Sequence, residues 1–151
     1  LRHREAELLQ LRVYQEARNM IYETIAERLA AQGVGVWKTL TAYTPNEVGI
    51  YIGEMPDTAQ SGIKLDTYLT AMELEASSTY LGVQVIIRSP NSFEAIRMEG
   101  DVIEALHSWE APEDGVQLSW LQSSASVGPD TMKRYGRSLN FYLITNHFAR
   151  E

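Results

Sequence analysis

The stretch of residues 80–109 constrains the fold of this chain most strongly. It begins with YLGVQVIIR, in which Val83, Val85 and Ile87 share one face, and this alternation of β-branched residues predicts a strand. Pro90 ends the strand, because proline has no amide proton to donate to a neighbouring strand. Residues 91–109 then change to a period of three and four, so the stretch is predicted to be a strand, a turn and an amphipathic helix.

The helix start and its buried face can both be assigned from the sequence. Asn91 is a helix N-cap candidate, with Glu94 three residues later as in a capping box. The apolar arc of the expected helix contains Ala95, Met98, Val102, Ile103, Leu106 and Trp109. Burying such an arc stabilises a fold by roughly 1.5–3 kcal/mol for each large side chain that is fully covered.

Glu99 interrupts this apolar arc. An unpaired carboxylate in an apolar interior is costly, so Glu99 requires a partner or a place at an interface. Arg137 is the candidate, because its parity in the last expected strand matches the core positions Leu139 and Phe141. The sequence therefore predicts an ion pair between Glu99 and Arg137 that sets the helix against the sheet. Two other interpretations stay open: Glu99 reaches water at the helix edge, or it meets a cation from a neighbouring subunit.

The remaining elements predict an α+β fold. A long helix is expected over residues 4–32, because apolar residues recur at spacings of three and four and Gly33 follows. Further strands are expected at residues 48–52, 63–69, 116–120 and 137–148, with residues 122–134 as a polar connection. Short connections favour antiparallel pairing. The predicted fold class is a single, mainly antiparallel sheet of about 4–5 strands with two main helices, one long and N-terminal, one after the central strand.

The chain divides into a helical N-terminal extension at residues 1–19 and one α+β domain at residues 20–151. The extension is the more highly charged part of the first helix. It is interpreted either as a solvated continuation of that helix or as an arm that packs on a neighbouring subunit. Residues 20–151 are sufficient for a single domain with a core of its own.

Composition excludes several classes of function. The chain has no cysteine, so disulfides, thiolate metal sites and cysteine nucleophiles are ruled out. Its net charge of -7 argues against a general nucleic-acid binder, and no apolar run approaches the length of a membrane span. Neither a catalytic motif nor a cofactor motif is present, so we expect no catalytic residues and no cofactor.

The titratable residues predict no site of their own. The three histidines, His3, His107 and His147, lack metal-ligand spacing, so no metal site is expected. The carboxylate pairs Glu73/Glu75 and Glu113/Asp114 are interpreted as solvated surface groups.

Four segments resemble the minor-capsid and tail-terminator proteins of long-tailed bacteriophages. They are VGIYIGEMPD at residues 48–57, GVQVIIR at 82–88 before the helix, GPD at 128–130, and GR at 136–137 leading into Asn140. The resemblance lies in the order and spacing of these motifs and covers roughly residues 20–148. The extension before Met20 departs from the family's pattern.

The resemblance implies a virion structural protein and not an enzyme. Such a protein forms a homo-oligomeric ring, commonly a hexamer, that ends the tail tube and joins it to the head-completion or neck proteins. DNA would pass through the lumen without specific binding, and the ring would be assembled in the host cytoplasm and reside at the head–tail junction of the virion, without a membrane. By position, the loop of Val127, Gly128, Pro129, Asp130 and Met132 is expected to contact a ring neighbour or the tube. Two alternatives remain: a neck or head-completion connector of the same joint, and a small bacterial α+β binding domain or enzyme.

Overall fold

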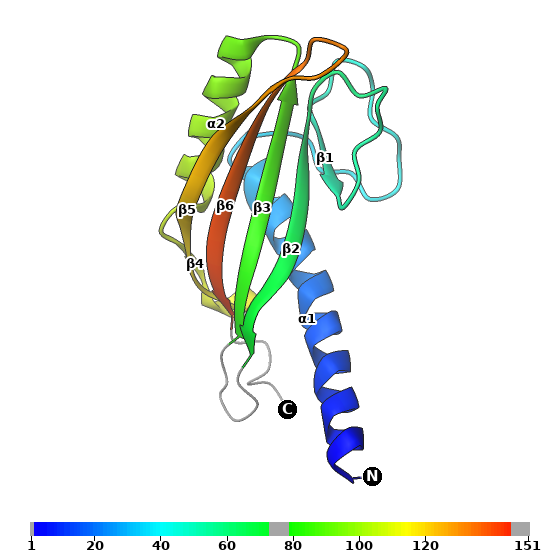
Figure 1. Ribbon diagram of the computed structural model, residues 1–151, viewed down its shortest axis with the longest axis vertical. Helices are drawn as coiled ribbons and strands as arrows, with labels where there is room; N and C mark the ends of the chain where they lie inside the picture. Colours follow the sequence, from blue (N-terminus) through cyan, green and yellow to red (C-terminus); the bar gives the residue numbers. More distant parts are fainter. Residues whose placement is uncertain (1, 73–78, 146–151) are drawn as a thin grey trace.

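A computed structural model of the chain describes residues 2–72 and 79–145. Its elements, in chain order, are α1 (Arg2–Ala31), β1 (Gly49–Ile52), β2 (Gly62–Met72), β3 (Thr79–Ser89), α2 (Ser92–Leu106), β4 (Trp109–Ala111), the 3-10 helix η1 (Pro112–Asp114), β5 (Val116–Pro129) and β6 (Tyr135–Thr145). In Figure 1 the strands form one curled sheet, and both α-helices lie behind it.

The sheet corrects the predicted fold class. The described residues form six strands in the order β1-β2-β3-β6-β5-β4, so the expectation of about 4–5 strands is wrong. The sheet is also mixed, because β1 runs parallel to β2, with Ile50 opposite Ile63. The chain crosses from the end of β1 back to the start of β2 through residues 53–61, and this return makes the pair parallel where short connections had favoured antiparallel pairing.

β4 is the strand that the sequence analysis missed. The helix α2 ends at Leu106, and Trp109, which had been assigned to its apolar arc, begins β4 instead. Ser108 has a φ of 59°, which turns the chain between helix and strand. Trp109 is still buried, so its apolar character was interpreted correctly while its element was not.

The β5–β6 hairpin also differs from the expectation. β5 extends to Pro129, so most of the segment assigned to a polar connection at residues 122–134 is strand. β6 pairs with both β3 and β5 along its length. The part of the last expected strand beyond residue 145 lies outside the described residues.

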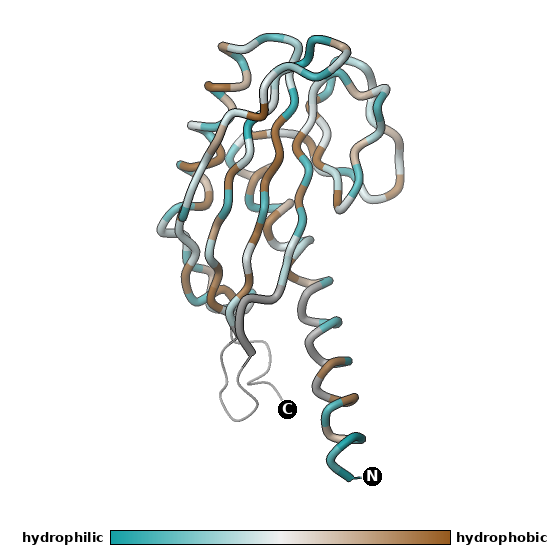
Figure 2. Tube along the Cα trace, viewed as in Figure 1, coloured by the Kyte–Doolittle hydropathy of each residue, from teal (hydrophilic) through white to brown (hydrophobic). Residues whose placement is uncertain are grey.

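The core lies between the rear face of the sheet and the two α-helices. Figure 2 shows the alternation of apolar and polar positions along the long strands. On α1 the core residues belong to its C-terminal half, and on α2 they belong to the arc identified from the sequence. The largest fully buried side chains are Phe141, Ile21, Ile25, Leu29, Ile50, Ile63, Leu65, Leu81, Ile87, Leu106, Leu139 and Leu143.

The front face of the sheet carries a row of aromatic side chains. The ring centroid of Tyr142 lies 4.9 Å from that of Trp120 and 5.7 Å from that of Tyr80. On β2 the ring of Tyr68 lies against Gly82 of β3, where a side chain would have no room. This row crosses four strands and covers part of a face that neither α-helix shields.

Candidate functional site

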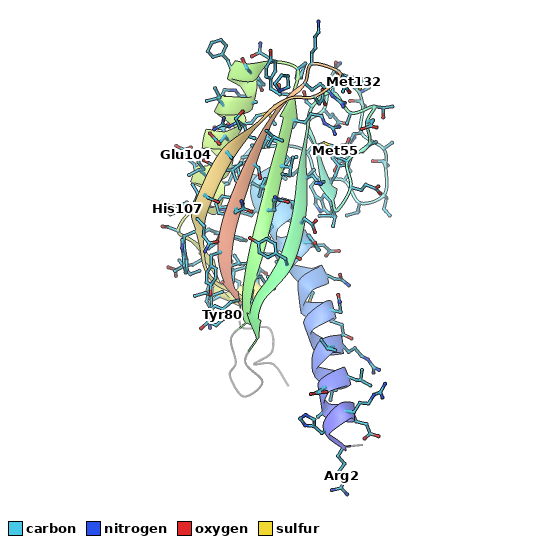
Figure 3. The ribbon with its side chains drawn as sticks, in the orientation of Figure 1. Arg2, Met55, Tyr80, Glu104, His107 and Met132 are labelled. Carbon is cyan, nitrogen blue, oxygen red and sulfur yellow. The ribbon has the colours of Figure 1, made fainter. Side chains whose placement is uncertain are left out.

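The loop expected to contact a neighbour or the tube lies at the end of the β5–β6 hairpin. Val127, Gly128 and Pro129 complete β5, and Asp130 opens the turn to β6. The side chains of Val127 and Met132 are 55% and 53% exposed. Figure 3 shows Met132 at one extreme of the molecule and Arg2 at the other. The hairpin end therefore presents two apolar side chains to the outside.

Asp130 organises this turn through its carboxylate. Oδ1 accepts hydrogen bonds from the backbone amides of Met132 and Arg134, each at 2.9 Å, and Oδ2 accepts one from Arg134 Nε at 2.9 Å. Carboxylates that accept local backbone amides commonly nucleate such turns. These bonds, the amide of Arg134 first, hold the pKa of the Asp130 carboxyl below its ordinary value.

Arg134 fastens the hairpin to the loop between β1 and β2. Its side chain is only 4% exposed, and a buried guanidinium is costly unless it is paired and hydrogen-bonded. Besides its bonds to Asp130, Nη1 donates to the carbonyl oxygens of Asp57 at 2.5 Å and Ala59 at 3.0 Å. The guanidinium therefore holds two segments together that are far apart in the sequence.

Arg88, at the end of β3, holds the same loop from another side. Its Nη1 donates to the carbonyl oxygens of Pro56 at 2.9 Å and Ala59 at 3.1 Å. Met55, in the same loop, places its sulfur against Gly62, where a larger residue would not fit. We refer to residues 53–61 and 127–135 together as the tip platform.

The segments that carry the family resemblance meet at the tip platform. Residues 48–57 supply β1 and the first half of the loop, residues 82–88 supply β3 and Arg88, and residues 128–130 supply the hairpin end. Residues 136–137 follow Tyr135 at the start of β6. The motifs therefore describe one region of the fold, held together by hydrogen bonds from two arginines.

Glu99 and Arg137 lie in contact, as their positions in the sequence had predicted. Arg137 Nε donates to Glu99 Oε2 at 2.9 Å, and Nη2 donates to Oε1 at 3.1 Å. The side chains are 23% and 12% exposed for Arg137 and Glu99. The pair links α2 to β6, and such two-pronged contacts have a well-defined geometry. The carboxylate therefore already has a cation from its own chain.

A second surface feature lies beside the tip platform. A hollow of about 420 Å3 is lined by residues that include Tyr43, Pro45, Tyr51 and Pro56. The Tyr43 hydroxyl donates to the carbonyl oxygen of Ile50 at 2.6 Å, so its ring is fixed in place. Burial, followed by the neighbouring Tyr43, raises the pKa of Tyr51. The lining combines these aromatic and apolar residues with polar ones such as Glu47 and Gln60.

Next to this hollow, Lys38 and Glu47 form an ion pair. Lys38 Nζ lies 2.8 Å from Glu47 Oε1. The same oxygen accepts the backbone amide of Thr44 at 2.8 Å. The hydrogen bond from Lys38, then that from Thr44, lowers the pKa of Glu47. The pair therefore fixes the segment that precedes β1.

The histidines and the carboxylate pairs are placed as follows. His107 Nδ1 accepts the backbone amide of Leu121 at 3.0 Å, and His3 Nε2 lies 3.0 Å from Glu7. Across residues 2–72 and 79–145, no three His, Asp or Glu side chains come together as metal ligands would. Glu113 and Asp114 lie on η1. His147, Glu73 and Glu75 lie outside the described residues.

The residue patterns of the sequence did not point to Arg88 or Arg134. Both stand in segments with ordinary strand or turn patterns, and their acceptors in residues 53–61 are backbone carbonyls, which leave no mark in the sequence. One signal was available: Asp130 and Arg134 are oppositely charged and four residues apart in a turn.

Comparisons with known proteins yield no family assignment. No protein-family model matches the chain, and no curated protein matches it. None of the described helices has the length and apolar character needed to cross a bilayer.

Proposed function

We propose that this chain is a virion structural protein whose ring ends the tail tube of a long-tailed bacteriophage and joins it to the head. The ring is a homo-oligomer, commonly of six copies in the family that the chain resembles. One face of the ring meets the tube protein and the other meets a head-completion or neck protein. The protein acts by binding other proteins and not by catalysis.

The observation that carries this proposal is the convergence of the resembling motifs on the tip platform. Arg88 and Arg134 fix the loop and the hairpin end against one another, while Val127 and Met132 project outward. A surface that is fixed from within and carries exposed apolar side chains is suited to protein contact. The motifs would thus preserve a docking surface rather than a reaction centre.

The charge of the chain is compatible with a ring around DNA. With a net charge of -7, the protein would repel the phosphate backbone rather than hold it. A lumen of this kind lets DNA pass without specific contacts.

The mass of the protein in solution tests the proposal. Sedimentation and electron microscopy of the purified chain should give closed rings, with six copies as the expected number. Addition of these rings to polymerising tube protein should stop growth at one end. A chain that remains a monomer at every concentration and leaves tube growth unchanged would refute the proposal.

A neck or head-completion connector of the same joint is the alternative assignment. Both proteins would present an outward surface like that of Val127 and Met132. A photo-crosslinker at position 132 separates the two, because it should capture tube protein if the chain is a terminator. Capture of a portal-side protein instead would favour the connector.

A further inference from the structure

The N-terminal half of α1 extends beyond the rest of the molecule. In Figure 1 the helix runs past the lower end of the sheet, and Figure 3 shows Arg2 at its free end. Leu8, Leu9 and Leu11 are 52%, 58% and 48% exposed. A helical segment of this length is marginal in water without packing, so its exposed leucines indicate a partner. We refer to residues 2–12 as the arm.

A groove lies at the other end of the same helix. It has a volume of about 710 Å3 and runs between the C-terminal half of α1 and the β4–η1 segment. Its acidic lining residues are Glu23, Glu27, Glu110, Glu113 and Asp114. Met20, Ala31, Trp109 and Ala111 provide its apolar lining. We refer to this feature as the acidic groove.

The basic residue in the acidic groove is already engaged. Arg28 Nε donates to the carbonyl oxygen of Ala105 at 2.9 Å, and its guanidinium lies 5.7 Å from the centroid of the Trp109 ring. Arg28 thus joins α1 to α2 and β4 at the floor of the groove. The carboxylates along the walls outnumber it and give the groove a negative field.

The arm cannot reach the acidic groove of its own chain. α1 is one helix from Arg2 to Ala31, and its residues Met20 to Ala31 form a wall of that groove. A straight helix cannot fold back along itself without a break. An arm that enters such a groove must therefore come from a second copy.

We propose that the arm of one copy docks in the acidic groove of the next. Arg2 and Arg4 make the free end of the arm basic where the groove is acidic, while Glu5 follows and Glu7 lies against His3 of the same helix. The α1 wall from Met20 to Ala31 spans about 16 Å at 1.5 Å per residue, which is long enough to take the arm. The leucines of the arm would then cover Met20 and the apolar lining, as amphipathic helices do in grooves.

This contact is head-to-tail, because the arm and the acidic groove are different surfaces of the same chain. Head-to-tail contacts form closed rings when the rotation between copies closes. The inference rests on the proposed function and adds to it the pair of surfaces that joins neighbouring copies. It leaves the tip platform free for the tube or the neck.

Charge reversal with rescue tests the pairing in the full chain. One variant carries Arg2→Glu and Arg4→Glu, a second carries Glu27→Lys and Glu110→Lys, and a third carries all four changes. Each of the first two should weaken association by at least about tenfold at low salt, as sedimentation measures it. The third should recover most of the loss, because the attraction is restored with its signs exchanged.

Glu104→Lys is the control, since its side chain is exposed and lies away from the arm, the acidic groove and the tip platform. It should leave association unchanged. Far-UV circular dichroism confirms that each variant is folded. If the wild type forms rings and the reversals do not affect them, or if the third variant shows no recovery, the pairing is refuted while the proposed function stands. If the wild type never assembles, both are refuted.

Discussion

The hydroxyl of Tyr22 on α1 accepts a hydrogen bond from the backbone amide of Thr67 on β2 at 2.8 Å. The same hydroxyl donates to Asp66 Oδ1 at 3.1 Å. β1 ends at Ile52, opposite Leu65, so the edge of β2 is no longer covered by a strand at this point. The helix therefore supplies an acceptor to this exposed sheet edge, beside Asp66 Oδ1, which also accepts the Thr67 amide at 3.0 Å.

Replacing Tyr22 by Phe tests this contact. The variant keeps the buried ring and removes the hydroxyl, so we expect a loss of about 1–2 kcal/mol in the free energy of unfolding. Urea denaturation measures it. Tyr68→Phe is the control, because Tyr68 is 44% exposed and its ring still lies against Gly82 after the change. Equal effects at the two positions would contradict a specific role for the Tyr22 hydroxyl.

Two glycine-to-alanine substitutions should have opposite effects. A Cβ at Gly49 would lie 2.7 Å from the ring of Tyr43, whose hydroxyl is fixed by Ile50, so the ring cannot move aside. We expect Gly49→Ala to destabilise the fold by about 1–3 kcal/mol. At Gly100, on the exposed side of α2, an added Cβ meets nothing within 4 Å, and Ala should stabilise the helix by about 0.5–1 kcal/mol. Thermal unfolding of both variants shows whether each substitution lowers or raises the stability of the fold.

Removing one partner of the Glu99–Arg137 pair should cost more than removing both. In Arg137→Met the largely buried Glu99 carboxylate loses both of its hydrogen bonds to Arg137, and we expect a loss of about 1–3 kcal/mol. In the double variant with Glu99→Met the loss should be smaller, because no carboxylate remains. A double-mutant cycle in urea measures the coupling. If Arg137→Met alone loses no stability, the pair does not stabilise the contact between α2 and β6.

The Asp130 turn should make the free energy of unfolding depend on pH in the acidic range. The pKa of Asp130 is lowered in the folded chain relative to its usual value of 3.8, so its contribution is present above that value and is lost as the pH falls through the folded pKa. Asp130→Asn lacks this titration. The difference in unfolding free energy between wild type and variant should therefore shrink below about pH 4. A difference that stays constant down to pH 2 would show that the carboxylate is not what holds the turn.

Local patterns identified the centre of this fold and missed its margins. The strand that became β3 and the helix that became α2 both follow from periodicity, and Asn91 Oδ1 does accept the amide of Glu94 at 3.0 Å. β4 was missed because Trp109 satisfies the helical spacing as well as the strand that it joins. The parallel direction of β1 depends on where residues 53–61 return, which no local pattern records.

The same distinction holds for the candidate site. The parity of Arg137 in its strand placed it opposite Glu99, because both elements have regular periods. The contacts of Arg134 with residues 53–61 could not be found in this way, since these acceptors are the backbone carbonyls of Asp57 and Ala59 in an irregular loop. Side chains that recognise backbone are invisible to patterns of residue type.

The continuity of α1 has a consequence for how this chain tolerates heat. Ile21, Ile25 and Leu29 fill the core with one end of a helix whose other end is exposed. In the proposed ring, a neighbour that binds the exposed end also restrains the end that is packed in the core. Dissociation of the copies and unfolding of the chain then become coupled. The melting temperature should therefore rise with protein concentration, and dilution alone should lower it.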